Sequence, residues 1–239
     1  MKTVKNYFTS IFLLFFVYHT MVAQLPSAKE SIDKIEAYYK TVNPLNLELT
    51  YTMYKGVTGN QITESYKGSI YKNKTISSMK VLGSEVLQFS EVQLLIDNEQ
   101  KTVIYKKNEH HFLEKSPLDM SSFLAYYKEA SAVIKEHHLV YEMILKNISI
   151  PVPYNRIVLY INMDTYAIEK QELYLSNKVP FFDKEGKQTD DIGRMEITFQ
   201  SSSNPIKDAP KLQDYVLLKP ELQLVQRYAN YTIIDQTNL

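Results

Sequence analysis

Short runs of alternating apolar and polar residues occupy the chain between residues 47 and 106. In the first run Leu47, Leu49 and Tyr51 alternate with polar residues, which is the two-residue period of a half-buried β-strand. Further short runs bounded by turn residues follow at 65–71, 75–81, 85–89, 92–96 and 101–106. Strands this short and closely spaced leave no room for crossover connections, so the pattern predicts an antiparallel meander.

Two other segments have the spacing of amphipathic helices. In residues 27–39 apolar side chains recur every three or four positions, and Ser27 with Glu30 forms the pattern of a capping box. In residues 119–135, Asp119 is a suitable N-cap for a helix with an apolar stripe along one face. We therefore expect one helix before the first meander and a second helix after it.

A second set of strands is predicted in the remaining sequence. It comprises residues 139–145, 156–163, 168–175 and 195–200, with a hairpin turn at 164–165 and a closing strand within 222–234. Residues 176–192 are polar and contain Pro180 and Gly186, which favours a long exposed hairpin loop. The order helix, meander, helix, meander, with no break in composition, predicts an α+β fold in one domain over residues 24–239.

The first 23 residues have the pattern of an export signal. Lys2 and Lys5 precede an apolar run at 11–17, and Ala23 is a small residue at the expected cleavage point. The apolar run is shorter than the ~20 residues that span a bilayer. We expect residues 1–23 to be a signal peptide and the protein to be periplasmic or secreted in soluble form. An uncleaved membrane anchor is the alternative.

Composition narrows the classes of partner. The chain has 27 basic and 27 acidic residues, and two of the lysines lie in the predicted signal peptide, so the exported part has a formal charge of −2. This balance offers no basic footprint for nucleic acid, and no nucleic-acid partner is expected. The chain contains no cysteine, which excludes disulfides, a lipid anchor through a thiol and a cysteine nucleophile.

Three segments share more than their alternation with a known family. They are "GSIYK" at 68–72, "LLIDNEQKTVIYKK" at 94–107, and "IVLYINMDTYAIEKQELYLS" at 157–176, which is followed by "MEITFQ" at 195–200. In the two longer segments a strand ends at an Asp turn and the next strand returns through Tyr or Lys. Together they resemble the periplasmic outer-membrane lipoprotein carriers, the LolA/LolB-like superfamily, over most of residues 28–205.

The resemblance implies a curved antiparallel β-sheet, a half-barrel, with helices covering its concave face and an apolar cavity that carries acyl chains. The chain departs from the family pattern after residue 72, where the carriers have an aromatic-Arg pair and this sequence has Lys74, Thr75 and Ile76. The arginines of the chain are Arg156, Arg194 and Arg227. The resemblance therefore supports a lipid-binding architecture more than the carriage of lipoproteins.

Apolar residues of the predicted strands and of the second helix are the candidates for lining such a cavity. They are Met53, Met79, Leu87, Phe89, Leu95, Tyr105, Phe123, Leu124, Tyr127 and Tyr160. Flexible thioethers such as that of Met79 suit variable chains. In a carrier, the helix over residues 119–135 would act as a lid above the ligand. The same residues also fit a plain packed core, so a filled domain is the alternative.

The sequence carries no strong metal or catalytic motif. The histidines outside the signal form two adjacent pairs, at 110–111 and 137–138, and neighbours in a strand point to opposite faces, so neither pair can supply two ligands to one ion without a bend. A metal site would need one histidine from each pair and a carboxylate such as Glu109 or Glu136. No serine sits in a Gly-x-Ser-x-Gly elbow, no Gly-rich phosphate loop exists, and the acid pair Asp190-Asp191 lies in the polar loop. We expect no metal, no cofactor and no enzymatic activity.

Two functions remain, with a hydrolase as a distant third. The leading hypothesis is a non-catalytic periplasmic protein that binds or carries an apolar ligand, either an acyl chain or a lipoprotein. The alternative is an envelope protein–protein interaction module with a filled core. Such a module would dock its partner through an exposed sheet edge or through residues 176–192.

Overall fold

The computed structural model describes residues 25–108, 118, 120–121, 123–147, 149, 151–202, 209–219 and 221–237. The predicted signal peptide, Asp119 and the histidine pair at 110–111 lie outside these residues. Within the described ranges, no helix is both long and apolar enough to cross a membrane.

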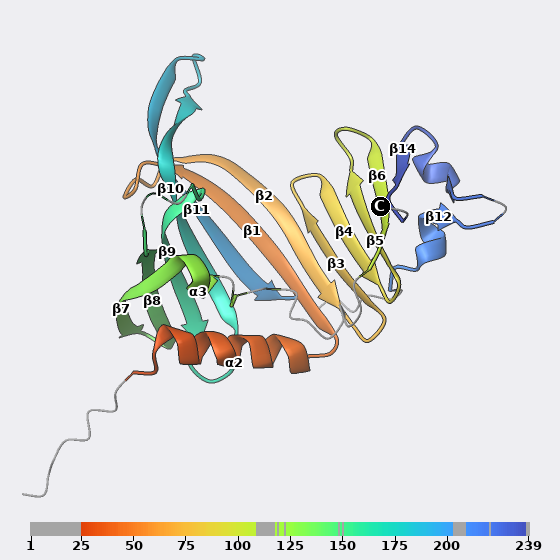
Figure 1. The fold of residues 1–239 in the computed structure, drawn as a ribbon. Helices are drawn as coiled ribbons and strands as arrows, with labels where there is room; N and C mark the ends of the chain where they lie inside the picture. Colours follow the sequence, from red (N-terminus) through yellow and green to blue (C-terminus); the bar gives the residue numbers. More distant parts are fainter. Residues whose placement is uncertain are drawn as a thin grey trace, which may run out of the picture.

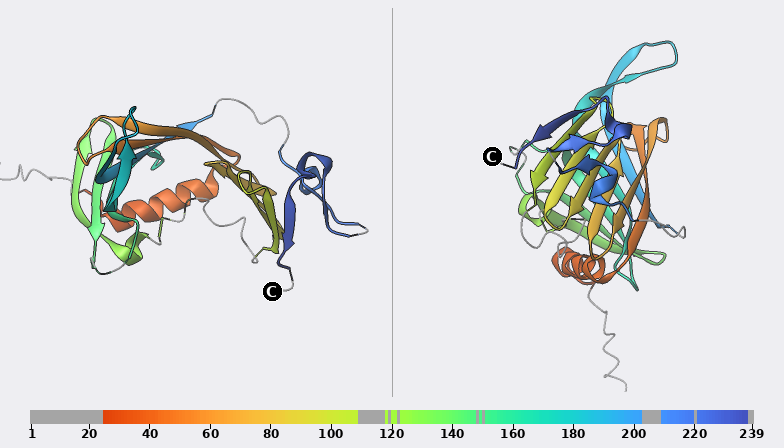
Figure 2. Two further views of the ribbon diagram at one scale, coloured as in Figure 1. Left: turned by 90° about the horizontal axis from the view of Figure 1, so that it is seen from above. Right: turned by 90° about the vertical axis from the view of Figure 1, so that its right-hand side faces the viewer.

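Twelve strands form one open, curved sheet (Figure 1; Figure 2). The strands are β1 (Leu45–Lys55), β2 (Ile62–Lys72), β3 (Ile76–Val81), β4 (Ser84–Phe89), β5 (Val92–Asp97), β6 (Thr102–Lys107), β7 (Tyr127–Lys135), β8 (His138–Leu145), β9 (Tyr154–Asn162), β10 (Ile168–Phe182), β11 (Gln188–Ser201) and β14 (Thr232–Asp235). Their spatial order is β14, β6, β5, β4, β3, β2, β1, β11, β10, β9, β8, β7. The pairing of β1 with β11 joins two antiparallel meanders, and β14 adds a parallel strand beside β6. The predicted curved antiparallel sheet is confirmed.

Helix α2 (Ala28–Thr41) starts where the sequence predicts it. The Glu30 amide donates to the Ser27 hydroxyl at 3.3 Å, and the Ser27 amide donates to the Glu30 carboxylate at 2.8 Å, which completes the predicted capping box. The buried side of the helix carries Ile32, Ile35 and Tyr39. This side packs against the sheet and places α2 within its curve (Figure 2).

The predicted second helix is wrong. Only α3 (Phe123–Tyr126) is helical, and residues 127–135 form strand β7, which pairs with β8 along its whole length. A two-residue turn at Glu136 and His137, with Glu136 at φ 53°, connects the strands. The three-residue spacing of the apolar side chains was compatible with a helix, but β-branched Val133 and Ile134 and the pairing with β8 stabilise a strand. The expectation that helices cover the concave face is therefore not confirmed, since α2 is the one long helix among the described residues.

The predicted loop at 176–192 is also corrected. Strand β10 continues to Phe182 and β11 begins at Gln188, so most of the segment is a paired hairpin. This hairpin arm, residues 178–192, projects beyond the body of the sheet (Figure 1). Asp183 at its tip accepts the amides of Glu185 and Lys187 at 3.0 and 2.8 Å.

The sheet has an inner face toward α2 and an outer face away from it. Residues that oppose each other in paired strands point to the same side. Leu47 opposes Ile70 of β2, and both belong to the buried cluster that contains the helix. This inner cluster includes residues of β1 and β8–β11, with side chains such as Leu159 and Ile161 that are at most 1% exposed.

A second buried cluster lies on the outer face of β3–β6. It is formed by Ile76, Leu87, Val92, Leu94, Ile96, Val103 and Tyr105 of the strands together with Tyr215 and Val216. The latter belong to the C-terminal segment, residues 209–237, which contains η2 (Leu212–Asp214), β12 (Val216–Leu217), β13 (Gln223–Leu224) and η3 (Gln226–Tyr228) before β14. The C-terminal segment therefore covers the outer face of one half of the sheet (Figure 2).

Candidate functional site

A row of aliphatic side chains runs across the strands on the inner face of β2–β6 and β14. Direct pairing across successive strands connects Ile70, Met79, Val86, Leu95, Ile104 and Ile234. We call these six residues the aliphatic stripe. Five strand spacings of about 4.8 Å give it a length of about 24 Å. It contains no aromatic or charged residue.

The exposure of the aliphatic stripe increases along its length. Ile70 is 1% exposed in the inner cluster, Met79 packs beside that cluster, and Val86, Leu95 and Ile104 are half-buried. Ile234 at the sheet edge is 42% exposed. The stripe therefore leads from the core to the surface as an apolar strip that the described residues leave partly open.

Polar rows border the aliphatic stripe on both sides. One row consists of Ser77, Gln88, Gln93 and Lys106, and the other contains Ser84, Asp97 and Thr102. Asp97 is occupied as a turn residue, because it accepts the amides of Glu99 and Gln100 at 2.9 Å each. A narrow apolar strip between two rows of hydrogen-bonding side chains matches the shape of a linear apolar chain. It matches a partner with a broad apolar surface less well.

The structure distributes the ten predicted lining residues over different environments. Met79 and Leu95 belong to the aliphatic stripe, and Met53 lies on the same inner face at the far end of β1, where its sulfur would be 3.1 Å from a Cβ at Gly193. Leu87, Phe89 and Tyr105 are on the outer face, in or against the cluster under the C-terminal segment.

The other four predicted residues belong to the second meander and α3. Leu124 and Tyr127 pack in or against the inner cluster, and the Tyr127 hydroxyl donates to the Tyr154 carbonyl at 2.7 Å. Tyr160 is on the outer face, where its hydroxyl donates to Glu172 at 3.0 Å. Phe123 is in α3, and its side chain lies outside the described residues. The ten residues do not share one surface, and a ligand role for any of them stays a prediction.

Four residues of the aliphatic stripe were not among the predicted lining residues, although the alternation in the sequence contained a signal for them. Alternation in β4 places Leu87 and Phe89 on one side of the strand and Val86 on the other. The side with the larger apolar residues was the one predicted to line a cavity. The C-terminal segment buries that larger side, which leaves Val86 with Ile104 and Ile234 on the inner face. Only the tertiary position of residues 209–237 decides between the two sides.

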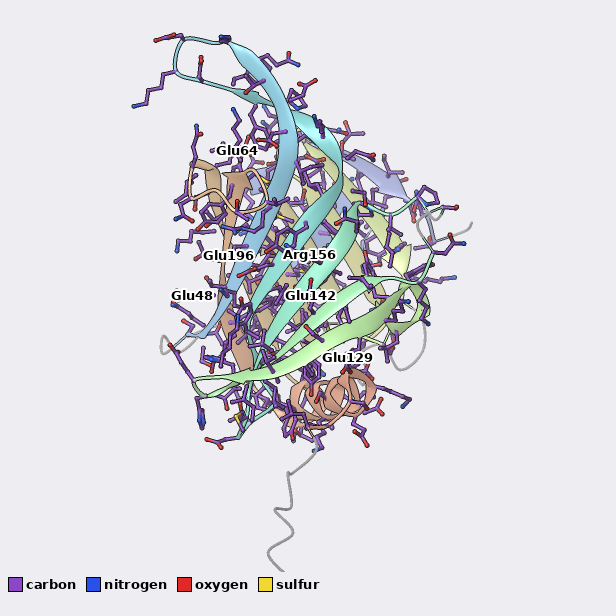
Figure 3. The ribbon with its side chains drawn as sticks, turned by 90° about the vertical axis from the view of Figure 1, so that its left-hand side faces the viewer. Glu48, Glu64, Glu129, Glu142, Arg156 and Glu196 are labelled. Carbon is purple, nitrogen blue, oxygen red and sulfur yellow. The ribbon has the colours of Figure 1, made fainter. Side chains whose placement is uncertain are left out.

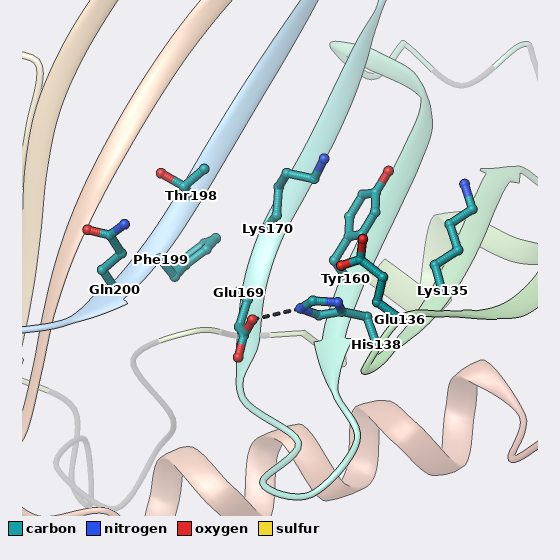
Figure 4. Close-up of a pocket in the computed structure, with 9 residues that line it drawn as sticks. All are labelled: Lys135, Glu136, His138, Tyr160, Glu169, Lys170, Thr198, Phe199 and Gln200. Atoms are coloured by element: carbon teal, nitrogen blue, oxygen red, sulfur yellow. Dashed lines mark hydrogen bonds and ion pairs between the residues drawn. The ribbon is translucent and has the colours of Figure 1, made fainter.

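A polar hollow of about 490 Å³ lies on the outer face of β8–β11 (Figure 4). His138 and Glu169 are 2.7 Å apart at its floor, and Lys170 donates to Glu172 at 2.9 Å. Burial would raise the pKa of the Glu172 carboxyl, but hydrogen bonds from Lys170, Tyr174 and Tyr160 outweigh burial and lower that pKa. The side chains of His138 and Lys170 thus each have a carboxylate partner within the chain, which is the arrangement of a structural network.

The histidines of the described part each pair with one carboxylate. His137 lies 2.7 Å from Asp164, and His138 lies 2.7 Å from Glu169. Within the described ranges, no three or more His, Cys, Asp or Glu side chains are placed to hold a metal ion. Asp190 of the predicted acid pair accepts a hydrogen bond from Gln188 at 2.9 Å on the hairpin arm.

Comparison with known proteins finds similarity in structure but not in sequence. No family model and no curated protein matches the chain. An uncharacterized conserved protein from Thermus thermophilus aligns with a TM-score of 0.41 at 10% identity, over 87% of this chain and 99% of that one. A LolA superfamily protein from Nitrosomonas europaea aligns with a TM-score of 0.30 at 10% identity, over 78% and 99%. The structural neighbours thus include the superfamily that the sequence resembles.

A third neighbour comes from a complex. The Pseudomonas aeruginosa MucA/MucB structure aligns with a TM-score of 0.40 at 12% identity, over 83% of this chain and 63% of that one. What this chain binds has to follow from its own residues.

Proposed function

We propose that the protein is a non-catalytic envelope protein that binds an acyl chain along the aliphatic stripe. The partly open apolar strip on the inner face of β3–β6 is the observation that carries this proposal. Its length of about 24 Å exceeds the ~15 Å depth of one leaflet of a bilayer core, so one acyl chain can lie along it. The thioether of Met79 adapts to chains of different shape.

The same proposal includes the location and the source of the ligand. Residues 1–23 act as a signal peptide, residues 24–239 form the exported domain, and the protein works in the periplasm or outside the cell. Resemblance to lipoprotein carriers supports a ligand that is a free acyl chain or the acyl part of a lipoprotein. Binding would be driven by burial of apolar area at roughly 25 cal/mol per Å², reduced by the cost of association.

Titration with a fluorescent fatty acid tests the proposal. Val86→Asn places an amide in the middle of the aliphatic stripe, and Val158→Asn makes the same change at a half-buried position on the outer face of β9. We expect Val86→Asn to weaken binding about tenfold, which corresponds to ~1.4 kcal/mol, and Val158→Asn to leave it unchanged. Absence of binding by the unmodified protein, or equal losses in both variants, would contradict the proposal.

A second candidate function rests on the hairpin arm. Phe182 near its tip is 63% exposed, the highest value among the large apolar residues described. The arm that carries it projects beyond the body of the sheet (Figure 1). An exposed aromatic side chain on a projecting hairpin is suited to docking another envelope protein. Phe182→Ser should remove a copurifying protein partner without changing fatty-acid binding if the arm has this function.

A further inference from the structure

Strand β7 is a long, exposed edge of the sheet. Within the described part of the chain, β8 is its sole strand neighbour, whereas the opposite edge strand, β14, is four residues long. No proline or glycine interrupts the nine residues of β7, and Val133 and Ile134 are 42% and 50% exposed. Long edge strands with exposed apolar side chains are templates for pairing with another strand.

The hairpin geometry identifies the backbone groups that are free for such pairing. Lys135 and His138 flank the two-residue turn, and in this type of hairpin the flanking pair exchanges its backbone hydrogen bonds. Hydrogen-bonded pairs alternate with non-hydrogen-bonded pairs along the ladder. The amides and carbonyls of Ala132 and Ile134 therefore point away from β8, toward the edge.

The charges at the two ends of β7 are complementary to those of a second copy in antiparallel orientation. Lys128 and Glu129 precede the apolar centre, and Lys135 and Glu136 follow it. If Ala132 lies on the two-fold axis, Lys128 opposes Glu136 and Glu129 opposes Lys135 of the other copy. A shift of one residue in either direction brings Lys128 opposite Lys135 or Glu129 opposite Glu136, and like charges in opposition are unfavourable.

From this complementarity we infer that β7 pairs with β7 of a second copy of the chain, about a two-fold axis at Ala132. The paired centre brings Ala132 against Ala132, Val133 against Ser131 and Ile134 against Ala130. Lys128 and Glu136 have no ion pair among the described residues, so both are available across the interface.

Glu129 already has a partner within its own chain. Its carboxylate accepts the Ala28 amide at 2.7 Å, and a register shift in the pairing with β8 lies beside it, between Glu129 and Ser131 (Figure 3 shows Glu129 beside the N-terminal end of α2). The pair of Lys128 with Glu136 is therefore the better one to test. The inferred dimer does not involve the aliphatic stripe and is independent of acyl-chain binding.

Charge reversal in sedimentation experiments on the exported protein tests this register. We expect a concentration-dependent dimer that is lost in Lys128→Glu and in Glu136→Lys, and regained in the double variant that carries both changes. Fatty-acid binding and thermal unfolding report whether each variant is folded. A protein that is monomeric at all concentrations, or a double variant that remains monomeric, would overturn the inference.

The lack of cysteine allows a direct test of the two-fold axis. In a hydrogen-bonded antiparallel pair the Cα atoms are about 5.5 Å apart, which is within the range of about 4.4–6.8 Å that a disulfide requires. Under mild oxidation, Ala132→Cys should yield a covalent dimer, whereas Ile134→Cys on the same edge should not, because it faces Ala130 of the other copy. Equal cross-linking of both variants would show that two copies meet at β7 without a fixed register.

Discussion

The two halves of the sheet bury opposite faces. Strands β1 and β8–β11 bury their inner face under α2 and leave an outer face of ion pairs, including Glu142 with Arg156 at 3.2 Å (Figure 3). Strands β3–β6 bury their outer face under the C-terminal segment. One continuous sheet thus has a filled inner face in one half and a partly open aliphatic inner face in the other, and the second half is where we propose that an apolar ligand binds.

Strand β2 is the boundary between the halves. Ile70 is still 1% exposed in the inner cluster, while the next strand already contributes Ile76 to the outer cluster. At Gly68 a Cβ atom would lie 2.7 Å from the Lys80 carbonyl oxygen and 3.0 Å from the Tyr51 ring. Because residue 68 is a glycine, the Tyr51 side chain can pack directly on the backbone of β2. This contact marks the end of the filled half.

The largest expected difference between the halves is in the free energy of unfolding that is lost when an inner-face side chain is truncated. Ile35 of α2 is fully buried, and Ile35→Ala should lower the free energy of unfolding by about 2–5 kcal/mol. Leu95 is half-buried, and Leu95→Ala should cost about 1 kcal/mol or less while weakening fatty-acid binding. Urea denaturation at constant m-value measures both. Similar losses in the two variants would mean that the second half is filled as well.

The local patterns predicted most of the elements. The two-residue alternation located β1–β6 and β8–β11, and Ser27 with Glu30 located the start of α2, because both signals depend on residues close in sequence. Strand β7 was missed because its stability comes from pairing with β8 through a turn at Glu136 and His137, which has no glycine or asparagine to mark it.

The candidate site was less predictable than the fold. Alternation separates Val86 from Leu87 but does not say which side is buried. That choice depends on the C-terminal segment, more than 100 residues later, and on Tyr215 and Val216, which no local pattern assigned to the core. Met79 and Leu95 lie on one face of the sheet, each opposite Val86, and their role in ligand binding stays a prediction.

An intermediate difference in stability is expected when the tyrosine hydroxyl groups that link α2 and the C-terminal segment to the sheet are removed. The Tyr39 hydroxyl of α2 accepts the Ile168 amide at 3.0 Å in a buried environment, so Tyr39→Phe should cost about 1–3 kcal/mol by leaving that amide unpaired. The Tyr215 hydroxyl contacts Glu85 at 3.3 Å, but Glu85 also pairs with Lys80 at 3.2 Å. Tyr215→Phe should therefore lower the stability of the fold less than Tyr39→Phe does. Thermal unfolding of the two variants measures this difference. A larger loss in Tyr215→Phe would mean that the C-terminal segment is held to the sheet more tightly than α2.

The smallest effect is expected on the charged outer face of the α2-covered half. The His138 and Asn162 side chains, both hydrogen-bonded to the Glu169 carboxylate, lower its pKa below the usual value. A carboxyl group with a lowered folded-state pKa stabilises the fold above its unfolded pKa, and this contribution is lost as the pH falls through the folded value. His138→Gln weakens the interaction and should cost ~0.2–1 kcal/mol near neutral pH, because both side chains are partly exposed. The difference between variant and unmodified protein should shrink as the pH falls through the lowered folded-state pKa of Glu169, because protonation of the carboxylate removes the interaction in both. Urea midpoints of both proteins measured from pH 3 to 7 test this. A difference between the two midpoints that increases as the pH falls would contradict the prediction.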